Sequence, residues 1–171
     1  MDLCQAVEYY LPHLVLAGDY AVRVQSRVQS AATKEAGATA FSQALTDADL
    51  SVQNMIEVAT LAQYPDVAFE PEEADRSLNL KYFPSESPFR LTLDPINGTA
   101  FYKDGLPIFD IIITILEGKR IVTAVVYLPA KGLFYIGIVG QGAFFATKGT
   151  GLKRQDWSRL QLQTRSEIVL T

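Results

Sequence analysis

The sequence predicts an α+β domain in which two long helices pack on an antiparallel sheet. Apolar residues recur every three to four positions through the first third of the chain, which is the period of an amphipathic helix. From Ile108 onward, short β-branched and aromatic runs alternate with turn residues, which is typical of an antiparallel meander. Helices followed by consecutive strands indicate a layered domain with the helices packed on the sheet.

An apolar stripe predicts the first helix. Its members are spaced three or four residues apart: Leu3, Val7, Tyr10, Leu14, Ala17, Ala21, Val24 and Val28. Pro12 removes one backbone donor within this stripe, so two helical pieces are an alternative to one continuous helix. The segment Lys34–Ser42 is rich in small residues and contains a glycine, and we expect a loop there.

A second apolar face predicts a second helix. It comprises Ala48, Val52, Met55 or Ile56, Ala59 and Ala62. We expect Thr46 to be the N-cap of this helix, with Asp49 three residues further on, because a threonine hydroxyl can accept a hydrogen bond from the first turn. Pro65 ends the pattern after Tyr64, since proline cannot continue a helix.

The remaining elements are predicted to be strands. Two short strands are predicted at Val67–Phe69 and Arg90–Leu93. The polar segment Glu70–Pro88 connects them. Four longer strands follow: Phe109–Leu116, Arg120–Leu128, Leu133–Ile138 and Gly142–Ala146. The run Ile111–Ile113 has no polar residue, so we expect both faces of that strand to be covered. Lys148–Arg159 is predicted to be a loop, and Ser166–Thr171 to begin a further strand.

Composition restricts the classes of function. The chain has 171 residues, of which 49% are apolar, and this suits a single domain over residues 1–171 with a sizeable core. A net charge of −4 provides no basic surface for nucleic acid. No segment reaches the roughly 18 apolar residues of a membrane span, and the N-terminus lacks a targeting pattern, so we expect a cytoplasmic protein that acts without a membrane. Cys4 and His13 are single, which excludes cysteine or histidine clusters around a metal.

The segment Asp94–Thr99, with the sequence Asp-Pro-Ile-Asn-Gly-Thr, carries the most chemical information. A strand delivers Asp94 at its C-terminal end, and Gly98 permits a tight turn before the hydroxyl of Thr99. Carboxylate, carbonyl, amide and hydroxyl oxygens can then meet at one point, which suits a hard cation such as Mg²⁺. The N–H groups of Gly98 and Thr99 would suit a phosphate oxygen if a helix begins there. A simple turn is the alternative, because Asp-Pro and Asn-Gly pairs commonly form turns.

This segment resembles the Asp-Pro-Ile-Asp-Gly-Thr signature of the inositol monophosphatase family of lithium-sensitive phosphatases. Further resemblances follow in the family's order: Thr46–Asp49 at a helix start, Phe69–Glu73 between a strand and a loop, and Val125–Pro129 through Gly140–Phe144 in a strand pair. The likeness covers Leu3 to Thr147. It implies the N-terminal layered domain of the inositol monophosphatase or fructose-1,6-bisphosphatase-like fold.

The resemblance also implies a role for each matching residue. Four residues would supply oxygen ligands to Mg²⁺: Glu72, Asp94, Ile96 (through its carbonyl) and Asn97. Asp49 and Thr99 would position and deprotonate an attacking water, and the backbone at Gly98 and Thr99 would hold the substrate phosphate. The substrate would be a small phosphorylated molecule, and we expect a homodimer because family members commonly form one.

Each role has a plainer alternative. Glu72 lies in an acidic stretch, and charge runs of this kind are commonly solvated loop faces. Asp49 could serve only the dipole of a helix start, and Thr99 could only cap a helix. Asp104 and Asp110 are interpreted as structural residues, the second as one that meets a partner at a strand edge. Tyr102 and Lys103 are candidates for substrate contact.

Three departures from the family pattern bear on function. Asn97 replaces a second aspartate, which removes a negative charge from the cation site. Pro71 replaces a glycine and stiffens the backbone before Glu72. The family's second α/β domain, which carries a further metal ligand, is expected to be absent from this chain.

Two hypotheses follow. In the first, the chain is a Mg²⁺-dependent phosphatase that hydrolyses small phosphate monoesters through an activated water. Inositol phosphates are the default substrates that the resemblance implies, and sugar bisphosphates and 3′-phosphorylated nucleotides are close alternatives. In the second, it is a catalytically impaired or fragmentary family member that binds metal or a partner as a scaffold.

Overall fold

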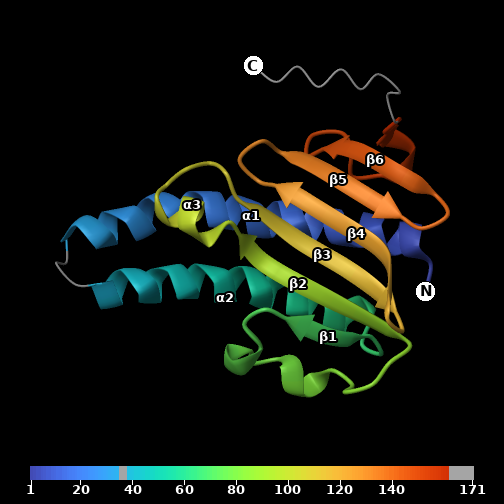
Figure 1. Cartoon of the computed structure of the whole chain (residues 1–171), viewed down its shortest axis with the longest axis horizontal. Coiled ribbons are helices and arrows are strands. Elements are labelled where there is room, and N and C mark those ends of the chain that lie inside the picture. Colours follow the sequence, from blue (N-terminus) through green and yellow to red (C-terminus); the bar gives the residue numbers. More distant parts are fainter. Residues whose placement is uncertain (35–37, 162–171) are drawn as a thin grey trace, which may run out of the picture.

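The computed structural model describes residues 1–34 and 38–161, and for residues 28–34 and 38–46 it describes the backbone alone. Within these residues, two long helices, α1 (Leu3–Lys34) and α2 (Ala38–Gln63), lie side by side on one face of a seven-stranded sheet (Figure 1). The predicted α+β fold of helices packed on a sheet is therefore confirmed. None of the described helices is long and apolar enough to cross a membrane.

Both helices are longer than predicted. α1 continues through Pro12 as a single helix. The loop expected at Lys34–Ser42 is wrong at both of its ends, because α1 reaches Lys34 and α2 already begins at Ala38. The part of this prediction at residues 35–37 lies outside the described residues. Thr46 therefore lies inside α2 and is not its N-cap. The alanine-rich start of α2 explains the error, since alanine has the highest helix propensity and needs no apolar periodicity to stay helical.

The strands pair in their order along the chain. They are β1 (Ala68–Pro71), β2 (Phe89–Asn97), β3 (Asp110–Glu117), β4 (Arg120–Leu128), β5 (Leu133–Ile138), β6 (Gly142–Thr147) and β7 (Ser158–Arg159). β1 runs parallel to β2, and the other described pairs are antiparallel. The connections contain short helices: 3-10 turns at Ala74–Arg76, Leu80–Tyr82 and Arg154–Asp156, and the helix α3 (Thr99–Lys103).

The strands predicted up to residue 146 are all present. Arg120–Leu128 and Leu133–Ile138 have the predicted bounds, and the bounds of the other four are shifted. The segment Lys148–Arg159, predicted to be a loop, ends in β7, which pairs with β6. A strand of two residues is too short for any alternation to appear in the sequence. The strand expected at Ser166–Thr171 lies outside the described residues.

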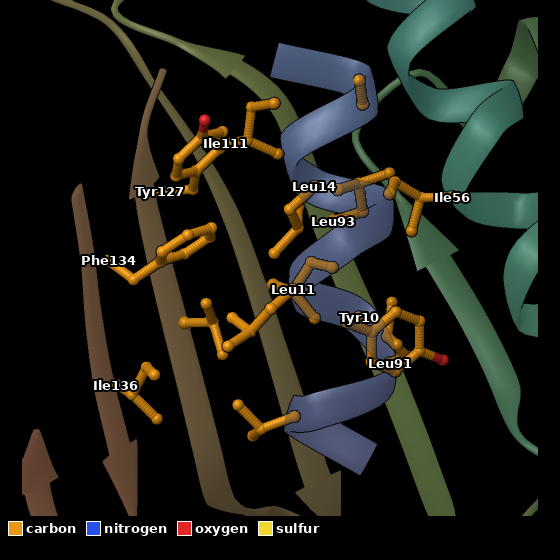
Figure 2. Packing of buried hydrophobic residues seen from close by; sticks show 14 of the residues in the cluster. Tyr10, Leu11, Leu14, Ile56, Leu91, Leu93, Ile111, Tyr127, Phe134 and Ile136 are labelled. Carbon is orange, nitrogen blue, oxygen red and sulfur yellow. The ribbon is translucent and has the colours of Figure 1, made fainter. Parts of the chain in front are cut away.

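The core lies between the helices and the sheet. Leu11 and Leu14 of α1 point toward the strands, where Leu93, Ile111 and Phe134 come to meet them (Figure 2). All five side chains are buried. Burying a large apolar side chain contributes about 1.5–3 kcal/mol relative to leaving it exposed, so this interface supplies much of the stability.

The opposite face of the sheet is less covered. In β3, Ile111 and Ile113 are buried, whereas Ile112 between them is only partly buried. The expectation that both faces of this strand are covered therefore holds fully only for the face toward the helices, and the other face is covered in part. Successive strand residues point to opposite faces, so an unbroken apolar run still has one face away from the helices.

α1 approaches the sheet closely at Gly18. A Cβ atom there would lie 2.5 Å from Cε1 of Tyr127 and 2.9 Å from Pro129. We expect Gly18→Ala to lower the free energy of unfolding by about 1–3 kcal/mol, because this overlap outweighs the better helix propensity of alanine. Urea denaturation measures the change. Gly137→Ala is the matched control, since its Cβ would meet no atom within 4 Å; equal losses in both variants would contradict the prediction.

Candidate functional site

Three elements bring acidic side chains to one end of the sheet. Asp49 extends from α2, Glu72 follows β1, and Asp94 lies near the end of β2. The N–H of Glu72 donates to the carbonyl oxygen of Leu93 over 3.0 Å. This bond extends the parallel pairing of β1 and β2 by one residue and so places Glu72 beside Asp94.

Pro71 is compatible with this arrangement. It is the last residue of β1, which is the first strand in the order of the described sheet. Proline is tolerated on edge strands because its missing N–H is not needed for pairing with a neighbour. Glu72 keeps its own hydrogen bond to β2, so the stiffer backbone still delivers its side chain to the end of the sheet.

Burial and mutual repulsion perturb two of the carboxyl groups. Burial, followed by repulsion from Glu73, Glu72 and Asp94, raises the pKa of Asp49 to about 7. The pKa of Asp94 is also raised to about 7, first by burial, then by the neighbouring Glu72 and then by Asp110. These directions show that the folded chain concentrates negative charge here at a cost to the ionised forms.

The carboxylate of Asp94 has an atom without a partner. Its Oδ1 is buried and has no hydrogen-bond partner among the described residues. A divalent cation would satisfy this atom and offset the repulsion among its neighbours. Across the part of the chain that the structure describes, no three acidic, cysteine or histidine side chains already lie close enough to hold an ion. The donor chemistry nonetheless fits Mg²⁺, since the candidate ligands are oxygen atoms, and binding would draw them closer together.

The segment after Asp94 forms the predicted tight turn. The pairing of β2 with β3 shifts between Asp94 and Asn97. Gly98 then takes a φ of 89°, in the left-handed region that glycine adopts without strain. A Cβ at Gly98 would lie 3.1 Å from the carbonyl oxygen of Ile108, just before β3. The close approach of this backbone also favours glycine.

Thr99 is the first residue of α3, so a helix does begin where the phosphate hypothesis requires one. Its hydroxyl donates to the carbonyl oxygen of Ile96 over 3.1 Å. Within the described residues no hydrogen bond joins Thr99 to Asp49, so the expected catalytic pair is not preformed. Asp49 lies close enough to α3 for its charge to raise the pKa of Tyr102, after the larger effect of burial.

Asn97 and Asp110 form a pair across β2 and β3. They are register partners, and Nδ2 of Asn97 donates to Oδ1 of Asp110 over 3.1 Å. The strand-edge partner predicted for Asp110 is therefore Asn97. The purely structural interpretation of Asp110 was incomplete, because its charge also raises the pKa of Asp94. Sequence reasoning missed this role because it depends on the register of two strands separated by α3.

Tyr102 was wrong as a candidate for substrate contact. The residue is fully buried, and its hydroxyl donates to the carbonyl oxygen of Ala21 in α1 over 2.7 Å. Its ring packs edge-on against Phe109, with 4.8 Å between centroids. The side-chain amide of Gln25 donates to the Tyr102 carbonyl over 3.1 Å. Tyr102 therefore fastens α3 to α1 and, through α3, holds Thr99 in place.

Comparison with known proteins identifies the family. The model of the inositol monophosphatase family matches residues 14–170, which is most of the chain. The chain belongs to the inositol monophosphatase family. The resemblance carried by the sequence motifs is thereby confirmed.

Curated relatives are longer than this chain. It is 32% identical over 95 residues to a fructose-1,6-bisphosphatase/inositol-1-monophosphatase of Aquifex aeolicus (strain VF5), a match covering 48% of this chain and 36% of that protein. It is 30% identical over 100 residues to a histidinol-phosphatase of Chlorobaculum parvum, covering 58% of this chain and 36% of that protein. The matched part of this family member thus spans about a third of each relative's length.

Solved structures share the fold of this family member. CysQ from Bacteroides thetaiotaomicron, a bacterial member of the family, superposes with a TM-score of 0.69 at 18% identity, covering 96% of this chain and 60% of that chain. IMPase from Thermotoga maritima gives a TM-score of 0.66 at 22% identity, covering 94% of this chain and 54% of that one. The layered fold expected from the motifs is therefore confirmed.

The raised carboxyl pKa values predict a pH dependence of stability in the metal-free protein. Between the ordinary carboxyl pKa of about 4 and the raised value, the folded state binds more protons than the unfolded state, so the free energy of unfolding falls as pH rises. We expect the protein in a chelator to be more stable at about pH 5 than at about pH 8, by urea denaturation. Asp94→Asn should flatten this slope, because it removes one raised group and relieves Asp49.

The exposed Asp66 provides the control for this measurement. Asp66→Asn should leave the pH dependence of the free energy of unfolding as in the wild type, since it removes a carboxylate that is not part of the site. A metal-free protein whose stability is equal at both pH values would contradict the electrostatic description of the site.

Proposed function

We propose that this chain is the metal-binding part of a Mg²⁺-dependent phosphatase that hydrolyses small phosphate monoesters, with inositol phosphates as the first candidates. The buried, unpartnered Oδ1 of Asp94 among neighbouring carboxylates is the observation that carries this proposal. Family membership supports it, as do the names of relatives, which are a fructose-1,6-bisphosphatase/inositol-1-monophosphatase and a histidinol-phosphatase. Both names describe enzymes that act on phosphate esters, and they differ in the alcohol that carries the phosphate.

The proposed ligands are oxygen atoms of Glu72, Asp94, Asn97 and the carbonyl of Ile96. When bound, Mg²⁺ would neutralise phosphate charge and lower the pKa of an attacking water. The carboxylates of Glu72 and Asp94 would supply the negative charge that attracts Mg²⁺. Because Asp49 and Asp110 add further negative charge nearby, the cation must bind before the substrate phosphate. An acidic site in a chain of net charge −4 repels a phosphate until its own negative charge is offset.

Asp49 is proposed as the proton acceptor, with Thr99 orienting the attacking water through its hydroxyl. A general base works best when its pKa lies near the working pH, and burial together with three acidic neighbours raises the pKa of Asp49 to about 7. Thr99 would exchange its hydrogen bond to Ile96 for one to water, a rotation that a hydroxyl makes easily.

The substrate phosphate is proposed to lie against the backbone at Gly98 and Thr99. The first N–H groups of a helix have no acceptor within the helix, so α3 offers donors at this point. Gly98 keeps the approach open, because it carries no side chain in a turn that already comes close to Ile108.

A scaffold role is the second candidate, and Asn97 favours it. Its side-chain nitrogen donates to Asp110, and its amide oxygen, the proposed ligand atom, brings no charge to the cation. Such a protein would bind Mg²⁺ without efficient turnover. Both candidates include a cytoplasmic location and a homodimer as proposals that rest on sequence.

Phosphate release distinguishes the two candidates. The purified chain is assayed with inositol 1-phosphate, fructose 1,6-bisphosphate and histidinol phosphate, with and without Mg²⁺. A phosphatase should release phosphate only with Mg²⁺, and Asp94→Asn should reduce the rate by at least about a hundredfold, because the central carboxylate is lost. Asp66→Asn should retain the wild-type rate. Mg²⁺ binding without release from any of the three substrates would favour the scaffold.

A charge restored at position 97 should have opposite effects with and without metal. Asn97→Asp would place a carboxylate directly opposite Asp110, and like charges facing each other across two strands cost about 0.2–1 kcal/mol. We therefore expect lower thermal stability in a chelator and tighter binding of Mg²⁺ by calorimetry. Asn97→Ala, which loses the amide without adding charge, is the control. Unchanged Mg²⁺ affinity in Asn97→Asp would show that this position does not face the metal.

A further inference from the structure

α2 carries fully buried polar side chains that the proposed chemistry does not use. Gln53, Glu57 and Thr60 each have 0% exposure. Thr60 is explained by the contact between the two long helices, because its hydroxyl donates to Ile56 and lies 3.1 Å from the hydroxyl of Tyr10. Gln53 and Glu57 instead bond to the segment that follows β1.

The side-chain amide of Gln53 pairs with the backbone of Glu73 at two points. The N–H of Glu73 donates to Oε1 of Gln53 over 3.3 Å, and Nε2 of Gln53 donates to the Glu73 carbonyl over 3.3 Å. The preceding residue, Glu72, is held from the other side by its bond to Leu93 of β2. The backbone of the two successive glutamates is therefore held between the helix and the sheet, which fixes the point from which the Glu72 side chain extends.

Glu57 is the centre of the same network. Its Oε1 accepts from Nε2 of Gln53 (2.9 Å) and from the hydroxyl of Ser77 (2.6 Å), and its Oε2 accepts from Nδ2 of Asn79 (2.8 Å). The hydroxyl of Ser77 also accepts from the N–H of Leu80 over 3.0 Å. Glu57 thus fastens the segment at a second point and orients Gln53 for its pairing with Glu73.

A buried polar network of this kind is a costly way to fill space. An apolar side chain at position 57 would need no hydrogen bonds, whereas each member of a buried network must be satisfied. What such a network does supply is one fixed orientation of the backbone. Asp49, Gln53 and Glu57 also lie four residues apart and therefore on one face of α2. The same helix face thus holds Asp49 and sets the position of Glu72 relative to it.

We infer that Gln53 and Glu57 are positioning residues that aim Glu72 at the cation and so set the affinity for Mg²⁺ without contacting it. The inference rests on the proposed function in that it takes Glu72 as a metal ligand. It predicts that metal affinity is sensitive to changes in the network even where the fold is intact.

The test measures Mg²⁺ binding alone, by calorimetry on the whole chain, well below the unfolding temperature of each variant. Gln53→Glu keeps the size of the side chain, but its ionised carboxylate cannot donate to the Glu73 carbonyl or to Glu57. We expect it to weaken Mg²⁺ binding by about tenfold, the effect of a lost buried hydrogen-bond pair. Ser77→Ala, which removes one donor to Glu57 from outside α2, should weaken binding by about two- to threefold.

Thr60→Val is the matched control, because it removes a buried hydroxyl from the same helix without touching the segment after β1. Weaker Mg²⁺ binding in the Gln53 and Ser77 variants with wild-type affinity in Thr60→Val supports the inference. Wild-type affinity in all variants, or equal weakening in all, overturns it. Should Gln53→Glu fail to fold, Ser77→Ala decides by the same criteria.

The inference and the proposed function can fail separately. A wild type that binds Mg²⁺, responds to Gln53→Glu and releases no phosphate overturns the hydrolysis and leaves the positioning role standing. If the wild type releases phosphate and both variants, Gln53→Glu and Ser77→Ala, bind Mg²⁺ with wild-type affinity, the positioning role alone is overturned. Absence of Mg²⁺ binding in the wild type overturns both.

Discussion

The hydrogen bond from the Glu72 N–H to the Leu93 carbonyl is the interaction on which the site depends. It extends the parallel pairing of β1 and β2 past the end of β1 and sets Glu72 beside Asp94. Parallel strands need a long connection, and here that connection starts with the glutamates and is bonded to α2. Because α2 also carries Asp49, the relative positions of three carboxylates follow from the register of one strand pair.

The parts of this fold with a local signal could be predicted from the sequence. Strands β3 to β6 are short β-branched or aromatic runs, and the turns between them contain glycines such as Gly118, Gly132 and Gly140, all of which have positive φ. The turn at Asp94–Thr99 was predictable for the same reason, since its strand end, its glycine and its helix start are contiguous.

Features that depend on distant contacts could not be predicted. Tyr102 follows the signature closely in sequence, but its side chain turns into the core to meet Ala21, and no local pattern indicates this. Asp110 acquires its influence on Asp94 only through the pairing of β2 with β3. Gln53 and Glu57 lie outside the apolar stripe of α2, so in the sequence they look like solvated helix residues. In the structure the segment after β1 covers them.

The two attachments of that segment to α2 also limit its length. Gln53 and Glu57 are one helical turn apart, about 6 Å along the axis, and their partners Glu73 and Ser77 are likewise four residues apart. An inserted or deleted residue between Glu73 and Ser77 would release one attachment or the other. Ser85 and Glu86, further along the same connection, are exposed, so extra residues there leave both attachments in place. The part of the connection that approaches β2 can therefore change in length without disturbing the position of Glu72.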